Sequence, residues 1–199
     1  LAGEVKFGGL VQTEATGKRF GISGLKLAFD GKQGEAGDAV ALDVNIAANA
    51  DIDLAKDQAI LSDFVLRMHE LSVTGDLTVS ALSAEPKFAG QLKVAEFNPK
   101  SLMKSLGMEV PVTSDASALT RLRADMTLVG SANSADMQNL SVAFDQSAMQ
   151  GNFKLVNFDD PQLAFDLQLD KLNLDDYLPP DEGTANGSAA GAGSSGSDL

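Results

Sequence analysis

The sequence contains no cysteine and no tryptophan, and it has one tyrosine and one histidine among 199 residues. Without cysteine, the chain can form neither a disulfide nor a thiolate centre. The ten phenylalanines suit burial better than stacking on bases or sugars. The one histidine, His69 in "RMHEL", offers little for general-base or triad chemistry, and we interpret it as a solvent-facing or interfacial residue. We therefore expect no catalytic site and no cofactor.

Long apolar runs and basic patches are also missing. No stretch of about 18 apolar residues occurs, so we expect no segment that spans a bilayer as a helix. The net charge is -13, of which -3 lies in the last 19 residues and -10 in the body. Lysine and arginine are scattered from Lys6 to Lys171 without a basic stripe. Such a body repels phosphates, which argues against nucleic acid and against simple electrostatic attraction to anionic membranes.

Paired carboxylates are the remaining candidates for a metal site. A calcium loop needs several clustered oxygen ligands and usually a glycine turn, which "DIDLAKDQ" lacks. The acids in "LDDYL" are better explained by the dipole of a short helix that begins there. The glycines of "FGISGLKLAFDG" run from strand to strand and do not form a phosphate-binding loop. We expect no metal at the three pairs, which are Asp51/Asp53, Asp159/Asp160 and Asp175/Asp176.

What the sequence does contain is alternation of apolar and polar residues. This pattern is typical of antiparallel strands with one dry and one wet face. Glycine, asparagine and aspartate separate the segments at intervals suited to hairpins. We therefore predict a mostly β, antiparallel fold. The clearest segments are 25–30, 71–79, 121–128, 140–145 and 163–169.

Helical signals are few. In "FNPKSLMKSLG", Asn98 suits an N-cap, Pro99 the first helical position and Gly107 a C-terminal stop, which predicts a helix of about two turns over 98–106. A second helical turn is expected at 174–178, before two prolines prevent continuation.

The chain repeats itself. The segments that begin at Pro86 and Pro161, "PKFAGQLKVAEFNPKSLM" and "PQLAFDLQLDKLNLDDYL", align without gaps at a spacing of 75 residues. "LKLAFD" at 25–30 also resembles "LSVAFD" at 140–145. Each unit has a meander of strands, a strand opened by proline and a short helix capped by asparagine. Such repeats stack into quasi-one-dimensional sheets. The identical pairs are Pro86/Pro161, Ala89/Ala164, Leu92/Leu167 and Asn98/Asn173.

This organisation predicts three regions. Residues 1–60 form strands of a preceding partial repeat, 61–180 form the repeat units, and the Gly/Ser/Ala-rich residues 181–199 form a flexible linker. Alternation is already under way in "GEVKFGG", so we expect the sequence to be a fragment with more chain on either side.

Residues 60–180 contain, in this order, a strand leading into "FNPKSLM", an "AL" turn, a "DQSAMQG" hairpin and the ending "LDDYLPP". This order of motifs resembles the AsmA family of bacterial envelope proteins. It implies a periplasmic segment of a protein held in the inner membrane by an N-terminal helix that is not in this sequence. It also implies a curved sheet that forms a taco-like groove, with one short helix per repeat unit.

The same resemblance implies a function without catalysis. The groove would shield and guide phospholipid or another acyl-chain lipid between the inner and outer membranes, supporting outer-membrane assembly and lipid homeostasis. The alternative is a closed β-sandwich, a structural or interaction module with a dry core and no lipid. The candidate lipid-facing residues are Phe88, Leu92, Val94, Leu122, Met126, Leu128, Leu140, Val142, Phe144, Leu163, Phe165, Leu167 and Leu169.

Overall fold

The computed structural model describes residues 2–33 and 39–180. Segment 181–199, for which we expect a linker, lies outside the described residues. The described part contains ten strands, one α-helix and one turn of 3-10 helix. In chain order they are β1 (Ala2–Thr13), β2 (Arg19–Gln33), β3 (Val40–Asp53), β4 (Gln58–Met68), β5 (Leu71–Ser80), β6 (Lys87–Phe97), α1 (Pro99–Ser105), β7 (Leu122–Ser131), β8 (Ser134–Phe144), β9 (Ser147–Val156), β10 (Gln162–Leu169) and η1 (Leu174–Tyr177).

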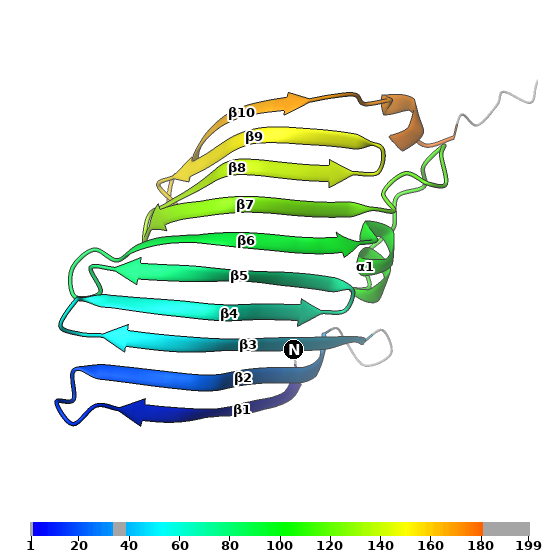
Figure 1. The fold of residues 1–199 in the computed structure, drawn as a ribbon. Helices are drawn as coiled ribbons and strands as arrows, with labels where there is room; N and C mark the ends of the chain where they lie inside the picture. Colours follow the sequence, from blue (N-terminus) through cyan, green and yellow to red (C-terminus); the bar gives the residue numbers. More distant parts are fainter. Residues whose placement is uncertain (1, 34–38, 181–199) are drawn as a thin grey trace, which may run out of the picture.

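All ten strands belong to one antiparallel sheet. Their order in the sheet is their order in the sequence, from β1 at one edge to β10 at the other. The sheet is curved and does not close on itself (Figure 1). The prediction of a mostly β, antiparallel and curved fold is therefore confirmed.

β-Bulges recur in every second strand of this sheet. In β2, β4, β6 and β8, two residues lie opposite one residue of the next strand. At three of these bulges one residue adopts a left-handed conformation: Gly24, Asp63 and Asn139, with φ of 60°, 53° and 50°. A bulge bends its strand and increases the local twist. The regular row of bulges thus contributes to the curvature of the sheet.

Asparagine side chains support the bulges. The amide oxygen of Asn49 accepts a hydrogen bond from the backbone N–H of Gly24 at 2.8 Å, and its amide nitrogen donates to Asp63 at 2.9 Å. Asn152 accepts in the same way from the backbone N–H of Asn139 at 3.1 Å. In both cases an asparagine of the neighbouring strand therefore satisfies one backbone N–H that the interrupted ladder leaves free.

Left-handed residues recur along the backbone at a fixed spacing. Three pairs of residues with left-handed backbone are each 76 residues apart and occupy equivalent places. The first pair is in the bulges of β4 and β8, the second in the turns after these strands, and the third at the ends of β5 and β9. The four strands β3–β6 therefore correspond to β7–β10. The pairs are Asp63/Asn139, His69/Asp145 and Ala81/Asn157.

Helix α1 forms where the sequence predicts it. The Asn98 side chain accepts a hydrogen bond from the backbone N–H of Ser101 at 3.0 Å, Pro99 occupies the first turn, and Gly107 has a φ of 68° after the C-terminus. The helix lies at one end of the strands, beside β4, β5 and β6 (Figure 1). The Ser105 hydroxyl donates to Glu70 at 3.3 Å, which connects α1 with the β4–β5 turn.

The second unit does not repeat this helix. Residues 174–177 form one 3-10 turn, and Asn173 makes no side-chain cap. Its amide nitrogen donates to the Asp176 carboxylate at 2.7 Å instead. The expected equivalence of Asn98 and Asn173 as N-caps is therefore wrong. The hydrogen bond to Asp176 engages the Asn173 side chain, which therefore caps no backbone N–H of η1.

Asp145 organises the strand ends beside η1. Its carboxylate accepts hydrogen bonds from the backbone N–H groups of Leu119, Thr120 and Arg121, at 2.7, 2.9 and 3.0 Å. It also accepts one from the Tyr177 hydroxyl at 3.0 Å, and the Tyr177 ring stacks on Phe144 at 5.2 Å. We call this arrangement the Asp145 junction.

The junction holds irregular segments in place. The Leu119 carbonyl accepts from the backbone N–H of Lys100 in α1, and the Leu178 carbonyl from that of Ser114. Burial raises the pKa of Asp145, but hydrogen bonds from the backbone and from Tyr177 outweigh it, and the net pKa is lowered. Burial and the hydrogen bond to Asp145 raise the pKa of Tyr177 to about 12. This contact of the Tyr177 hydroxyl was not predicted from the sequence.

Candidate functional site

One face of the sheet carries apolar side chains from the first strand to the last. Residues directly opposite each other in a ladder point to the same side, so the register assigns each strand residue to a face. We use the name "apolar face" for the side of the sheet that bears the residues given in the next sentence. Its large members are Val5, Phe7, Val11, Phe20, Ile22, Leu25, Leu27, Phe29, Val40, Leu42, Val44, Ile46, Ile52, Leu61, Phe64, Leu66, Met68, Leu71, Val73, Leu77, Val79, Phe88, Leu92, Val94, Phe97, Leu122, Met126, Leu128, Met137, Leu140, Val142, Phe144, Met149, Phe153, Leu155, Leu163, Phe165, Leu167 and Leu169.

All thirteen candidate residues that the sequence indicated lie on this face. They belong to β6, β7, β8 and β10, and the register joins them into a continuous surface. The sequence reasoning missed most of the members in β1 to β4 and in β9. The bulges explain part of this, because the apolar positions of β4 change from odd numbers (Ala59, Leu61) to even numbers (Phe64, Leu66) across the bulge. A search for unbroken alternation loses the strand there.

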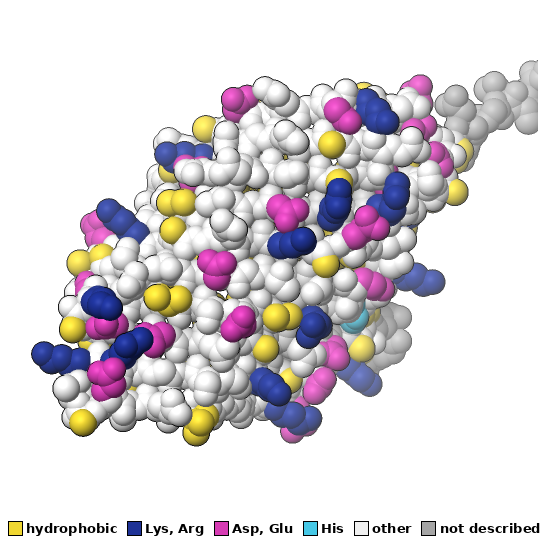
Figure 2. All heavy atoms as spheres, viewed as in Figure 1, with side chains coloured by type: hydrophobic (Ala, Val, Ile, Leu, Met, Phe, Trp, Pro, Cys, Tyr) yellow, Lys and Arg dark blue, Asp and Glu magenta, His cyan; other side chains and the backbone are white. Residues whose placement is uncertain are grey.

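Charge is confined to the other side of the sheet. By the same register, none of the described strand residues on the apolar face is Asp, Glu, Lys or Arg. The opposite face, which we call the charged face, bears acidic and basic side chains intermixed over all strands (Figure 2). Arg19 and Asp51 form a bidentate pair there, with Nη2 3.0 Å from Oδ2. The two faces therefore differ sharply in polarity.

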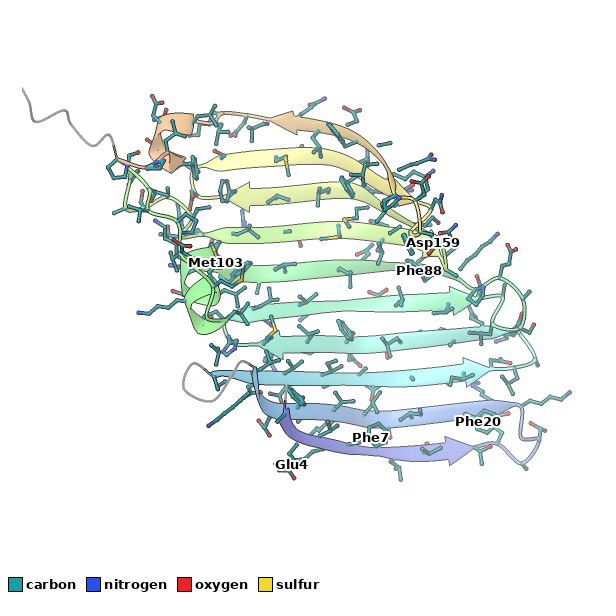
Figure 3. All side chains as sticks on the ribbon, turned by 180° about the vertical axis from the view of Figure 1, so that it is seen from behind. Glu4, Phe7, Phe20, Phe88, Met103 and Asp159 are labelled. Carbon is teal, nitrogen blue, oxygen red and sulfur yellow. The ribbon has the colours of Figure 1, made fainter. Side chains whose placement is uncertain are left out.

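The apolar face has no second layer in the part of the chain that the structure describes. Among all described residues only four apolar ones are buried, and no large side chain is completely buried. Large side chains at the sheet edges are the most exposed, with Phe7 74% and Phe165 70% accessible. Seen from behind, Phe7, Phe20 and Phe88 stand along different strands of the one sheet (Figure 3). A closed sandwich would bury such residues between two sheets about 10 Å apart.

Only one end of the apolar face is covered. Gly107, after α1, lies against Val40 of β3, and Tyr177 of η1 covers Phe144 at the end of β8. Both contacts are at the strand ends where α1 and η1 lie (Figure 1). No second element among the described residues lies over the middle of the strands.

Glycines on the apolar face bring neighbouring strands close together. A Cβ on Gly75, Gly90 or Gly151 would collide with a backbone carbonyl oxygen of a neighbouring strand. At Gly130 a Cβ would meet the ring of Phe88, which lies opposite in the ladder. Large side chains thus fill the space beside the glycines, so the surface stays apolar where a side chain is missing.

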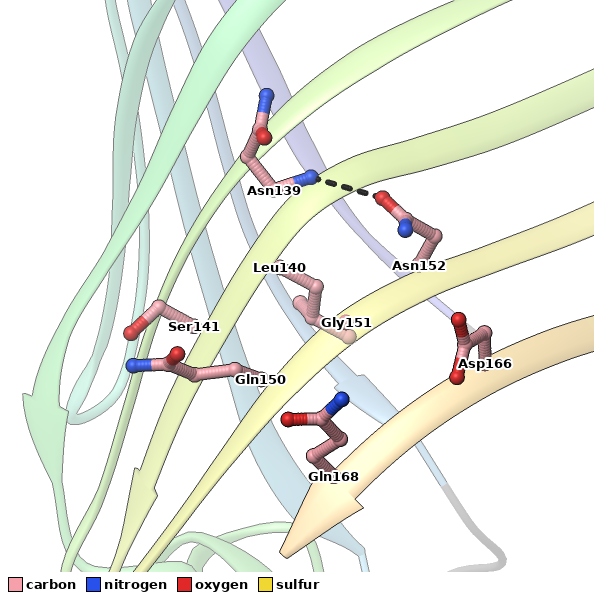
Figure 4. A pocket seen from close by; sticks show the side chains of 8 residues that line it. All are labelled: Asn139, Leu140, Ser141, Gln150, Gly151, Asn152, Asp166 and Gln168. Carbon is pink, nitrogen blue, oxygen red and sulfur yellow. Dashed lines mark hydrogen bonds between the residues drawn. The ribbon is translucent and has the colours of Figure 1, made fainter.

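One depression lies on the charged face, beside the β8 bulge. It has a volume of about 460 Å³ and opens widely to solvent. Its polar lining comes from three neighbouring strands, and the Asn139 to Asn152 hydrogen bond crosses it (Figure 4). Of its lining residues only Asp166 is charged. The lining is Asn139, Leu140, Ser141, Gln150, Gly151, Asn152, Asp166 and Gln168.

Both members of the pair Asp51/Asp53 have structural partners. Asp51 binds Arg19, and Asp53 accepts hydrogen bonds from the backbone N–H groups of Ala55 and Lys56 at 3.0 Å. Asp175 and Asp176 lie in the first turn of η1. Within residues 2–33 and 39–180, no group of three or more His, Asp or Glu side chains is arranged to hold a metal ion. His69 is an exposed turn residue with a φ of 50°.

Comparisons of the chain with family models, with curated proteins and with solved structures find no match. None of the helices among the described residues is long and apolar enough to cross a bilayer.

Proposed function

We propose that the apolar face shields the acyl chains of lipids from water, and that the chain guides lipid along the sheet as part of an AsmA-like envelope protein. The observation that carries the proposal is an uncharged face that runs unbroken through ten strands while large side chains on it stay accessible. Soluble proteins rarely leave an apolar surface of this extent uncovered unless something binds there. In this proposal the protein lies in the periplasm and connects the two membranes of the envelope.

The dimensions of the sheet suit acyl chains. Ten strands have nine spacings of about 4.8 Å, so the apolar face measures about 43 Å across the strands. The hydrocarbon core of a bilayer, with two layers of acyl chains, is about 30 Å thick. Each methylene buried on such a surface contributes about 0.8 kcal/mol. An acyl chain thus has room to lie across several strands without meeting a charge.

The charges favour hydrocarbon over headgroup as the recognised part. In the described strands, charged side chains lie on the charged face, where they are in contact with water. None lies on the apolar face, so no charged group there is placed to bind a phosphate or an ammonium group. The alternative function, a structural module with a dry closed core, loses its main support because the described residues form a single sheet.

The test compares two charges on one strand. Leu167 lies on the apolar face of β10 and Gln168 on the charged face. The wild type is purified, incubated with phospholipid vesicles that carry a photo-crosslinkable acyl chain, and assayed for crosslinked lipid. We expect crosslinking to be lost in Leu167→Glu and in Phe165→Glu and retained in Gln168→Glu, which adds the same charge to the other face.

Folding is checked in parallel. Since Phe165 and Leu167 are 70% and 37% accessible, their glutamate variants should keep the cooperative thermal transition of the wild type. A wild type that takes up no lipid contradicts the proposal. Equal crosslinking of Leu167→Glu and Gln168→Glu also contradicts it, because the lipid would then not lie on the apolar face.

A further inference from the structure

The connection between β6 and β7 is much longer than the others in the sheet. It comprises residues 98–121 and includes α1, whereas the other connections between consecutive strands have two to six residues. Pairing does not require this length, because Phe97 and Leu122 lie directly opposite each other in the ladder. Phe144 and Ser147, which are paired in the same way, are joined by a turn of two residues. We call residues 98–121 the strap. A long excursion between neighbouring strands is usually functional.

The strap lies across one end of the apolar face. After α1, Gly107 reaches Val40 of β3, which is three strands away from β6. A Cβ on Gly107 would collide with a methyl group of Val40, so the strap touches the face directly at this point. A helix with its side chains is about 10–12 Å thick. Helix α1 therefore forms a wall of about this height at the ends of β4, β5 and β6, where Met103 marks its position (Figure 3).

Hydrogen bonds fix the strap along its length. The backbone N–H of Lys100 donates to the Leu119 carbonyl at 3.2 Å, which closes the strap on its own base. The backbone N–H of Ser114 donates to the Leu178 carbonyl at 2.7 Å, beside η1. The Asp145 carboxylate holds the last residues of the strap at the β8–β9 turn. The strap is thus anchored at points between β3 and the segment that follows β10.

The opposite strand ends carry only short turns, which connect β1 with β2, β3 with β4, β5 with β6, β7 with β8 and β9 with β10. Neighbouring turns bind each other there. The backbone N–H of Leu82 donates to the Asp57 carbonyl at 3.4 Å, and that of Asn157 to the Asn133 carbonyl at 2.9 Å. Such backbone pairing continues the sheet into the turns. We call these strand ends the turn side, and the ends with α1 and η1 the strap side.

A phospholipid on this face would have two ends with opposite requirements. Its acyl chains gain from contact with the apolar face, whereas its charged headgroup has to stay hydrated, because removing a charge from water without a partner is costly. On the strap side, α1 and the paired backbone of the strap stand between the face and the solvent. On the turn side the described residues place no such wall, and the face extends to the solvent.

We propose that the strap closes one side of the apolar face, so that phospholipid enters and leaves over the turn side and keeps its headgroup there. This inference rests on the proposed function, which places lipid on the apolar face. It adds a direction to that function, since headgroups would pass along one side of the sheet only.

The test locates the headgroup with one labelled cysteine at a time. The sequence has no cysteine, so Ala135→Cys and Val142→Cys each provide a single site for a fluorophore. Both residues are half-buried on the apolar face of β8, Ala135 next to the β7–β8 turn and Val142 toward the strap side. About 20 Å of strand separates them. Each labelled variant is incubated with phosphatidylcholine vesicles that carry a nitroxide quencher either in the headgroup or at the end of an acyl chain, and is then separated from the vesicles.

We expect the headgroup nitroxide to quench the Ala135→Cys label and to leave the Val142→Cys label nearly unchanged. The acyl-chain nitroxide should quench both labels. A headgroup nitroxide that quenches both labels equally, or the Val142→Cys label more strongly, overturns this proposal and leaves the proposed function intact. No quenching by either lipid at either position contradicts the proposed function and this inference with it.

A disulfide between the strap and β3 tests whether the strap is a fixed wall. A Cβ on Gly107 would lie 3.6 Å from the Cβ of Val40, which is within the range that a disulfide bridges. The double variant Val40→Cys/Gly107→Cys therefore ties the strap to β3 when oxidised, and the same protein after reduction is its control. We expect equal uptake of the photo-crosslinkable lipid in both states. Uptake that is lost on oxidation overturns the proposal, because lipid would then have to pass beneath the strap.

Removal of the wall should abolish the preference of the headgroup for the turn side. With residues 98–121 replaced by Asn-Gly, Phe97 and Leu122 are joined by a two-residue turn of the kind that hairpins favour. In this shortened chain we expect the headgroup nitroxide to quench both labels. A folded shortened chain in which it still spares the Val142→Cys label overturns the proposal. The labels and the disulfide test the intact strap, so they decide the proposal even where the shortened chain does not fold.

Discussion

Asp145→Ala should detach the strand ends around η1 while leaving the far half of the sheet folded. Five hydrogen bonds converge on the Asp145 carboxylate: three from backbone N–H groups, one from Tyr177 and a longer one of 3.5 Å from the Thr120 hydroxyl. A hydrogen bond to a charged group contributes about 1.5–3 kcal/mol. Because the carboxylate is partly accessible and water replaces some of the bonds, we expect a loss of about 3 kcal/mol in the free energy of unfolding.

Tyr177 makes the effect measurable at one place. It is the only tyrosine and the sequence has no tryptophan, so the near-UV circular dichroism and the phenolate absorbance report the Asp145 junction. In the wild type the pKa of Tyr177 is raised to about 12 by burial and by Asp145. In Asp145→Ala we expect this pKa to move toward the ordinary value of about 10. Urea unfolding followed by the same signal gives the free energy.

Asp159→Ala is the matched control, since Asp159 is an exposed carboxylate in the β9–β10 turn. It should leave both the tyrosine signal and the unfolding midpoint unchanged. If Asp145→Ala unfolds at the wild-type urea concentration and Tyr177 still titrates near 12, the junction does not stabilise the fold and the reasoning is refuted.

Three further predictions concern the backbone and pH. Asn98→Ala should lower the free energy of unfolding in urea by about 1 kcal/mol, because it removes the cap of α1. Asn173→Ala should lower it by less, since Asn173 makes no cap. Equal losses would contradict the difference between the two units. Gly151→Ala should lower the thermal midpoint, because the new Cβ would collide with the Asp166 carbonyl and because Gly151 has a φ of 148°. Gly8→Ala should leave the midpoint nearly unchanged, because a Cβ there meets nothing within 4 Å. Similar midpoints for the two variants would argue against a close approach of the strands at Gly151. The pKa values of Asp115, Asp145 and Asp170 are lowered in the folded protein. The stability that these carboxylates contribute is therefore present above their ordinary pKa of about 4 and is lost as the pH falls through the lowered values. A urea midpoint that does not change between pH 6 and pH 3 would contradict this.

Alternation in the sequence predicted the strands and the face on which the thirteen candidate residues lie, because side-chain direction follows from a period of two. Helix α1 was predictable because Asn98, Pro99 and Gly107 each satisfy a distinct local requirement of a helix end. The bulges were not, since a left-handed Asp63 or Asn139 looks like any polar strand residue until its neighbours are known.

Two other features depended on partners distant in the chain. Tyr177 aligns with the apolar Leu102 in the repeat, and only the position of Asp145 shows why a hydroxyl is needed there. Whether the sheet is open or closed was equally undetermined, because both arrangements require the same alternation along each strand. The number of sheets comes from pairing between strands, which a single alternating segment does not encode.

The order of the strands has a consequence for how the protein is made. Each strand pairs only with the strands immediately before and after it in the chain. Contacts between sequence neighbours have low contact order, and their loops close quickly. A strand that leaves a ribosome or a translocation channel therefore finds its partner already in place and never has to wait for a distant one. The sheet can grow from β1 toward β10 as the chain emerges, with only its newest edge unpaired at any moment.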